Sequence, residues 1–198
     1  MKIVFASGNE GKVKEIREML AGMGIELVSL KNYSGVPEII EDGKTFLENA
    51  LKKARIISAF TGETVLADDS GLSVDELGGE PGIYSARYAG ETATDDDNIT
   101  LLLSKLKNVP QEKRTASFSC ALVLYRTDGS YDSFESKWSG LIIDNRHGDN
   151  GFGYDPVFYV PELNKTAAEM PPELKNRVSH RGQAFAKLKK ALEEKLKN

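Results

Sequence analysis

The sequence contains few of the residues that build disulfides or zinc sites. Among its 198 residues are one cysteine, two histidines and one tryptophan. A lone Cys120 cannot form an internal disulfide, and it does not cluster with histidine at a spacing typical of zinc ligands. A disulfide-stabilised scaffold and a structural zinc domain are therefore excluded, and the cysteine count agrees with a reducing, cytoplasmic location.

Long apolar runs and an excess of basic residues are also missing. No stretch reaches the roughly 18 apolar residues expected of a membrane span, and the apolar segment after Met1 is too short for a signal peptide. The 26 Lys and Arg are outnumbered by 30 Asp and Glu, giving a net charge of −4. This balance does not indicate a nucleic-acid-binding surface. We expect a cytoplasmic protein that binds neither membranes nor nucleic acid, although a local basic pocket for a small anion remains compatible.

The composition favours a globular α/β protein. Hydrophobic residues make up 40% and charged residues 28% of the chain, enough to build a core. Periodicity predicts a strand at 2–6, a helix at 13–20 and a strand at 25–30, so the chain opens as strand, turn, helix, strand. With no repeat, linker or low-complexity tract, we expect a single domain spanning 1–198.

Further patterns predict the remaining elements. Thr45 and Glu48 form a Thr-x-x-Glu capping box for a helix to about residue 60, and a buried strand at 64–68 ends in an acidic run. An Asp-Gly pair predicts a hairpin turn. The other predicted elements are an ordered loop at 78–90, a helix capped by Thr94, strands at 115–126, 131–143 and 157–160, and a last helix from near Ser179.

The turn from Ser7 to Lys12 is a candidate phosphate site. Its backbone N–H groups and the following helix N-terminus can hold phosphate oxygens, and Lys12 adds charge. It is not a P-loop, because only Asn9 and Glu10 separate Gly8 from Gly11-Lys12 and a valine follows. The alternative is an ordinary strand-to-helix turn with a solvated lysine.

The acidic run Ala67-Asp68-Asp69-Ser70-Gly71 is the candidate catalytic centre. Adjacent strand residues point to opposite faces, so two acids at a strand end either cap a turn or share a cation where the chain bends. Mg²⁺ prefers such oxygens, and a neighbouring carboxylate can activate water. The alternative is an Asp-rich turn. Glu41 is the best remote carboxylate to complete a metal site, its alternative being a solvated loop acid.

Two later segments are candidates for binding a base. In Gly151–Asp155, glycines allow close backbone approach, Phe152 or Tyr154 can stack on a base, and Asp155 can accept from ring N–H groups. The alternative is a bulged aromatic strand start. His180 and Arg181 are donors at a helix start, the alternative being exposed polar residues after a Ser N-cap. Lys53 and Lys175 are further candidate cations.

Five stretches together resemble the inosine triphosphate pyrophosphatase family, which hydrolyses non-canonical purine nucleoside triphosphates. They are SGNEGKVKEI at 7–16, TFLENALKKA at 45–54, LADDSGLSVDELGGEPGIYSARYAG at 66–90, GFGYDPVF at 151–158 and SHRGQA at 179–184. Each stretch is weak alone, but their order and their spread over nearly the whole chain make the combination specific.

The resemblance implies a mixed α/β fold, with an elongated central mixed sheet flanked by helices and a nucleotide cleft between two lobes. It implies a Mg²⁺-dependent homodimer that cleaves ITP, dITP and XTP between the α- and β-phosphates, removing them from the nucleotide pool. The alternatives are a triphosphate pyrophosphatase of other or broader base specificity and a non-catalytic nucleotide-binding module.

The resemblance also implies residue roles. The proton acceptor falls on Asp69, and the magnesium ligands fall on Asp69, Asp68 and Glu41, with Glu38 or Asp42 as alternatives to Glu41. Ser7 stands where many relatives have Thr, which keeps the hydroxyl group. The residues implied to bind substrate are Ser7, Gly8, Asn9, Glu10, Gly11, Lys12, Lys53, Ser70, Phe152, Gly153, Tyr154, Asp155, Lys175, His180 and Arg181.

Overall fold

The computed structural model describes residues 1–196, which divide into two compact units. Unit 1 comprises Met1–Asp69, Cys120–Ser136 and the described residues from Arg181 on, and unit 2 comprises Ser70–Ser119 and Lys137–His180. The chain passes repeatedly from one unit to the other, so neither is a continuous segment. The expected single domain and the expected nucleotide cleft stay predictions.

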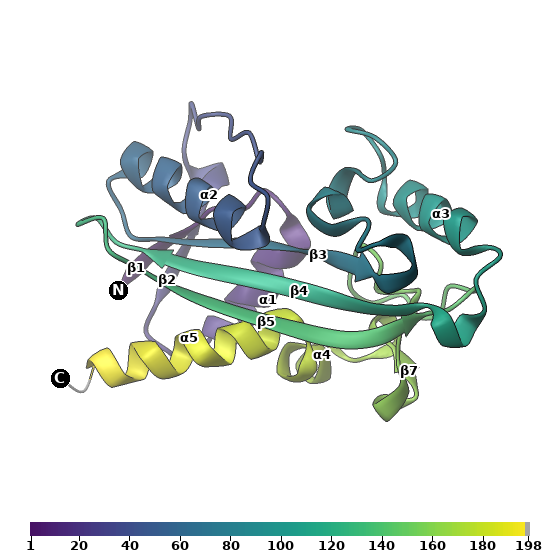
Figure 1. Cartoon of the computed structure of the whole chain (residues 1–198). Coiled ribbons are helices and arrows are strands. Elements are labelled where there is room, and N and C mark those ends of the chain that lie inside the picture. Colours follow the sequence, from purple (N-terminus) through teal and green to yellow (C-terminus); the bar gives the residue numbers. More distant parts are fainter. Residues whose placement is uncertain (197–198) are drawn as a thin grey trace. The chain divides into compact units, whose positions relative to one another are not determined.

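The strands form one seven-stranded sheet in the order β2-β1-β3-β4-β5-β6-β7 (Figure 1). β1 pairs in parallel with β2 and β3, whereas β6 pairs antiparallel with β5 and β7, so the sheet is mixed as predicted. The strands are β1 Lys2–Phe5, β2 Glu26–Ser29, β3 Val65–Val74, β4 Thr115–Tyr125, β5 Tyr131–Ile142, β6 Phe158–Val160 and β7 Lys165–Thr166.

Five α-helices occur in residues 1–196, joined by short 3-10 turns. They are α1 Glu10–Leu20, α2 Phe46–Thr61, α3 Asp95–Leu106, α4 Pro172–Val178 and α5 His180–Leu196. The sequence predicted all of these except α4, a short helix. Within the described part of the chain, no helix combines the length and the apolar character needed to cross a bilayer.

In unit 1, helices cover both faces of the strands. Alternate strand residues point to opposite faces. Val4 and Ala67 pack with Ile57 of α2, and Phe5 and Leu66 pack with residues of α1 and α5. Figure 1 shows α2 and α5 on opposite sides of these strands. A side chain of β3 therefore meets α2 or the α1 and α5 pair according to its position in the alternation.

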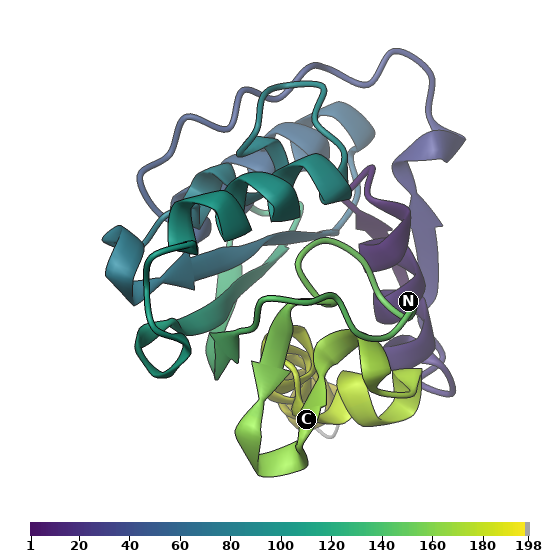
Figure 2. The ribbon, with the colours of Figure 1, turned by 90° about the vertical axis from the view of Figure 1, so that its right-hand side faces the viewer.

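Unit 2 has its own core, built around α3. Ile99, Leu102 and Leu106 of α3 belong to one buried cluster with Phe118 and Phe158. The start of α3 is fixed as predicted, by a reciprocal capping box between Thr94 and Asp97. β6 and β7 form a small antiparallel hairpin, drawn in light green in Figure 2.

Two local predictions are wrong. β3 does not end in the acidic run but continues through it to Val74, because Leu72 and Val74 have a core to enter. The Thr45 side chain caps α2, but Glu48 accepts from the Lys44 N–H at 2.6 Å instead of closing the capping box on Thr45. The first difference changes the active-site interpretation, because it places the two acids inside a strand.

We expect Leu102→Ala to destabilise the protein by about 2–5 kcal/mol, because it leaves a cavity beneath α3 in a fully buried position. Urea denaturation measures the change. Lys107→Ala, an exposed position just after the same helix, is the control and should leave the midpoint nearly unchanged. Equal effects of the two substitutions would contradict the assignment of the core.

Candidate functional site

The carboxylates of Asp68 and Asp69 lie within β3 and meet different helices. Asp68 contacts Lys12 of α1 and Arg181 of α5, whereas Asp69 contacts residues of α2. Adjacent strand residues point to opposite faces, which accounts for this division. The two acids therefore do not cap a turn, so that alternative is wrong, and their binding of a shared metal ion stays a prediction.

The Asp69 carboxylate is held by two side chains of α2. Lys53 Nζ lies 3.0 Å from Asp69 Oδ1, and Asn49 Nδ2 donates to Asp69 Oδ2 at 3.2 Å. Asn49 and Lys53 are four residues apart and so share one face of the helix. Lys53 Nζ also lies 3.1 Å from Glu41 Oε2. One ammonium group thus bridges Glu41 and Asp69.

The three acids of the loop before α2, Glu38, Glu41 and Asp42, differ in exposure and in the residues they contact. Glu41 is half-buried and reaches Lys53, while Asp42 pairs with Lys52 at 2.5 Å and is exposed, as is Glu38. Of the three acids that the sequence left open as metal ligands, Glu41 is the one with a described contact to the Asp69 cluster.

Burial and charge set the protonation of this cluster. Burial raises the pKa of the Asp69 carboxyl and Glu41 adds to the rise, with Lys53 and Lys12 opposing it. Burial disfavours the charged form of Lys53, but Asp69 and Glu41 outweigh it and raise the lysine pKa. Lys53 therefore stays cationic, while the Asp69 pKa moves toward the range that suits a proton acceptor.

Asp68 is the centre of a buried set of charges. It pairs with Lys12, accepts from Arg181 Nε at 2.9 Å, and accepts from the Cys120 thiol at 3.3 Å. Arg181 Nη1 also reaches Glu15 Oε2 at 2.5 Å. Burial opposes ionisation of Asp68, but Arg181 and Lys12 outweigh it and hold its pKa well below the ordinary value.

These contacts bear on two predicted roles. Both oxygens of Asp68 contact cations, Oδ1 that of Lys12 and Oδ2 that of Arg181, and metal binding by Asp68 stays a prediction. Arg181 contacts Asp68 and Glu15 and is itself buried, as is typical of a cation that stabilises the fold. The role of Arg181 in reading a base stays a prediction.

The turn before α1 is ordered by its own side chains. Asn9 Oδ1 accepts from the Lys12 N–H at 3.0 Å, and Ser7 Oγ accepts from the Asn9 N–H at 3.2 Å. Asn9 is the N-cap of α1, and the exposed Glu10 pairs with Lys31. An ordered turn with a helix N-terminus suits an anion, and phosphate binding by Ser7–Lys12 stays a prediction.

In unit 2, Asp155 organises the glycine-rich loop. Its Oδ2 accepts from the Phe152 N–H at 2.9 Å and from Lys175 Nζ at 2.5 Å, and Lys175 Nζ lies 4.9 Å from the centre of the Phe152 ring. Gly151 has φ of +80°, and a Cβ there would lie 2.0 Å from Asp155 Oδ2. The loop therefore requires glycine at 151, and Phe152, Asp155 and Lys175 form one cluster.

Other contacts anchor the same loop. The Gly153 N–H donates to Asp95 Oδ2 at 2.6 Å, and the Tyr154 hydroxyl donates to the Ser85 carbonyl at 2.8 Å. Tyr154 is buried in the unit 2 core, whereas Phe152 is partly exposed. Of the two candidate stacking residues, Phe152 is therefore the accessible one.

His180 is buried, contrary to the alternative of exposed polar residues at the start of α5. Its ring stacks on Phe118 with a centroid distance of 4.8 Å and an interplanar angle of 11°. The Trp138 ring is also stacked with the His180 ring, at a centroid distance of 6.4 Å and an interplanar angle of 19°. Ser70 is half-buried in β3. Base binding by His180 and substrate contact by Ser70 stay predictions.

Magnesium has a limited donor set here. Among residues 1–196, no group of three or more His, Cys, Asp or Glu side chains is arranged to hold a metal ion. Glu41 and Asp69 nonetheless converge on one lysine. Mg²⁺ is often bound by one or two carboxylates, with substrate phosphates and water supplying the remaining ligands. Two carboxylates therefore fit magnesium bound together with a nucleotide.

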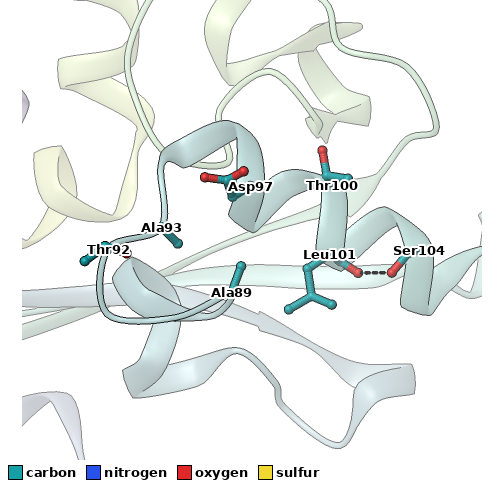
Figure 3. A pocket seen from close by; sticks show the side chains of 7 residues that line it. All are labelled: Ala89, Thr92, Ala93, Asp97, Thr100, Leu101 and Ser104. Atoms are coloured by element: carbon teal, nitrogen blue, oxygen red, sulfur yellow. Dashed lines mark hydrogen bonds between the residues drawn. The ribbon is translucent and has the colours of Figure 1, made fainter.

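A hollow of about 480 Å³ beside α3 is not part of this chemistry (Figure 3). Its one ionisable side chain, Asp97, is used in the capping box with Thr94. Its lining residues are Ala89, Thr92, Ala93, Asp97, Thr100, Leu101 and Ser104.

Sequence reasoning missed three residues that hold the clusters. Asn49 contacts Asp69, Glu15 contacts Arg181, and Asp95 holds the loop at Gly153. Helical spacing was the available signal for two of them, because Asn49 precedes Lys53 by four residues and Glu15 follows Lys12 by three. Nothing local in the sequence marks Asp95.

The family model of the Ham1 family matches residues 3–191. The chain belongs to the Ham1 family. Ham1 relatives named dITP/XTP pyrophosphatase include one from Geobacter sulfurreducens, 51% identical over 95% of this chain and 94% of the relative. Another, from Vibrio cholerae, is 51% identical over 98% of this chain and 97% of the relative. The resemblance to this family of pyrophosphatases is thereby confirmed.

Solved Ham1 structures share the fold. A HAM1 protein from Coxiella burnetii has a TM-score of 0.88 at 42% identity, covering 98% of this chain and 99% of that one. The Staphylococcus aureus Ham1 protein has a TM-score of 0.87 at 42% identity, covering 98% and 100%. The predicted mixed α/β fold of this chain is thereby confirmed.

We expect Asp68→Asn to lower the unfolding free energy by about 3–5 kcal/mol at neutral pH, because Lys12 and Arg181 lose their buried counter-charge. The folded-state pKa of Asp68 is depressed, so its contribution is present above about pH 3.9 and is lost as the pH falls through the lower value. Urea denaturation from neutral to acid pH measures this. The gap between wild type and variant should narrow only in acid.

The control is Asp128→Asn, an exposed acid in the hairpin turn. It should leave the denaturation midpoint at neutral pH nearly unchanged. A destabilisation by Asp68→Asn no larger than that of the control would show that the charge set contributes little.

Proposed function

We propose that this chain hydrolyses non-canonical purine nucleoside triphosphates, namely dITP, XTP and ITP, to the monophosphate and pyrophosphate. The observation that carries the proposal is the match over nearly the full chain, at 51% identity, to relatives named for dITP and XTP hydrolysis. The buried Asp69 beside Lys53 supports a catalytic rather than a merely binding role.

In the proposed reaction, Asp69 accepts a proton from a water molecule. The water oxygen bonds to the α-phosphorus, the bond from that phosphorus to the α–β bridging oxygen breaks, and pyrophosphate leaves. Lys12, Lys53 and the N–H groups of the turn before α1 neutralise phosphate charge, so the protein mainly positions and stabilises. The raised pKa of Asp69 supports its part as base.

We further propose that the reaction depends on magnesium held by Glu41 and Asp69. When bound, Mg²⁺ would neutralise phosphate charge and orient the triphosphate. Asp68, the third ligand that the resemblance implies, contacts Lys12 and Arg181 and would also fix the lysine of the phosphate-binding turn.

The base is proposed to be bound by the cluster of Phe152, Asp155 and Lys175, with Phe152 stacking on the ring. A hydrogen-bond donor of the protein that faces the 6-keto oxygen would pair with hypoxanthine and with xanthine. Adenine carries an amino group there and would leave that donor unpaired, which is costly in a buried site.

Two properties of the whole molecule belong to the proposal. A cytoplasmic location is supported by the lone Cys120, which is buried and forms no disulfide. A homodimer is the assembly that the family resemblance implies, and sedimentation analysis measures it.

We expect pyrophosphate release from dITP, ITP and XTP with kcat/KM at least about 10²-fold above that for dATP or ATP, because a donor facing the 6-keto oxygen discriminates strongly. A panel of triphosphates with pyrophosphate detection measures this. Asp69→Asn keeps the side-chain shape but removes the base, and should lower kcat by about 10²–10⁴-fold. Comparable kcat/KM for ATP and ITP would contradict the base preference, and nucleotide binding without turnover would establish a binding module.

Neighbouring loop acids give a matched test of the metal proposal. Glu41→Gln should raise the Mg²⁺ concentration for half-maximal activity by at least about tenfold, because it removes a charged oxygen ligand. Asp42→Asn removes the same charge from a side chain that pairs with Lys52 instead, so its Mg²⁺ requirement should stay within about twofold of wild type. An equal rise of the Mg²⁺ requirement in both variants would show that the effect comes from the change in net charge, which would contradict a ligand role for Glu41.

A further inference from the structure

Asn49 has no exposed surface, and its amide reaches in two directions. Its Nδ2 donates to Asp69 Oδ2 at 3.2 Å, and its Oδ1 accepts from the Gly43 N–H at 2.8 Å. Gly43 belongs to the loop that carries Glu41. One buried side chain therefore ties the catalytic strand to the loop of the other acid.

Lys53 makes a second link of the same kind, one helical turn further along α2. Its Nζ lies 3.0 Å from Asp69 Oδ1 and 3.1 Å from Glu41 Oε2. Each oxygen of Asp69 thus has its own partner on α2, Oδ1 with Lys53 and Oδ2 with Asn49. Two separate donors define the plane of a carboxylate, which a single donor cannot do.

Gly43 comes too close to α2 to carry a side chain. A Cβ at this position would lie 2.6 Å from Asn49 Oδ1 and 2.9 Å from Glu48 Cβ. Such distances force a shift of the neighbouring atoms or of the loop. The close approach is what brings the Gly43 N–H within reach of the buried amide, so glycine at 43 and asparagine at 49 depend on each other.

We propose that Asn49 is a positioning residue of the active site. It orients the Asp69 carboxylate and holds the Glu41 loop against α2, so that both acids keep a fixed relation. The inference rests on the proposed function, in which Asp69 accepts the proton. Hydrolysis requires the base within a few tenths of an ångström of its working position, and a displacement of about 1 Å can lower the rate about 10²-fold.

The chain offers a matched control in Asn98 of α3. Asn98 is also a buried helical asparagine, its Oδ1 accepting from the Ala89 N–H at 2.8 Å and its Nδ2 donating to the Ala86 carbonyl at 3.3 Å. Both asparagines fasten a loop to a helix, but Asn98 touches no carboxylate in these contacts. Substitution at 98 therefore reports the cost of losing a buried amide alone.

The test compares Asn49→Leu and Asn49→Asp with Asn98→Leu. Asn49→Asp keeps an acceptor for the Gly43 N–H and loses the donor to Asp69, but it adds a second carboxyl beside Asp69, so its kcat is taken at the plateau of its pH profile. Asn49→Leu loses both contacts and adds no charge. We measure kcat and KM for dITP by pyrophosphate release, melting temperature, and hydrogen exchange of residues 36–45 without nucleotide or metal.

We expect Asn49→Asp and Asn49→Leu to lower kcat by about 10²-fold with KM within about threefold of wild type. Asn98→Leu should keep kcat within about twofold of wild type, even if its melting temperature falls as much as that of Asn49→Leu. Exchange at 36–45 should rise in Asn49→Leu and stay near wild type in Asn49→Asp. If Asn49→Leu does not fold, Asn49→Asp carries the kinetic test.

Wild-type kcat in Asn49→Asp would overturn the proposal, as would an equal loss of kcat in Asn98→Leu. A wild-type protein that releases no pyrophosphate from any triphosphate would instead refute the proposed function. The structural half of the inference would then still be decided by hydrogen exchange, since unchanged exchange at 36–45 in Asn49→Leu would show that Asn49 does not hold the loop.

Discussion

The burial of two neighbouring carboxylates in β3 constrains every helix of unit 1. A buried carboxylate without a partner is too costly to keep charged, so each acid needs cations or donors on its own face of the strand. α1 and α5 supply Lys12 and Arg181 to Asp68, and α2 supplies Lys53 and Asn49 to Asp69. The core on both faces is arranged around this requirement.

The division between the two acids separates two tasks. Asp68 pairs with two cations that hold its pKa low, so it stays charged at neutral pH and fixes Lys12. Asp69 is only partly compensated, and burial raises its pKa. Two aspartates at adjacent positions thus acquire different pKa values from the helices they meet, and this difference is what the proposed roles of base and fixed counter-charge require.

Much of this could be predicted from the sequence where the signal is local. Periodicity and capping predicted α1, α2, α3 and the β4–β5 hairpin. The family resemblance grouped Asp69, Lys53 and Glu41, which the structure brings into contact. The extent of β3 could not be predicted, because the acids look like a strand end until the core around Leu72 is known. Asn49 and Asp95 escaped notice because their roles depend on contacts with residues distant in sequence, at Asp69 and Gly153.

The contact between Asp68 and Arg181 joins residues 113 positions apart, and Glu15 extends the same set of charges toward the start of the chain. During synthesis, the Arg181 counter-charge of Asp68 therefore becomes available only after nearly the entire polypeptide has been made. Until α5 has been made, this strand carries an acid that water stabilises better than a partly formed core does. A chain broken off before residue 181 lacks Arg181 and α5, so of these two cations Asp68 would keep Lys12 alone.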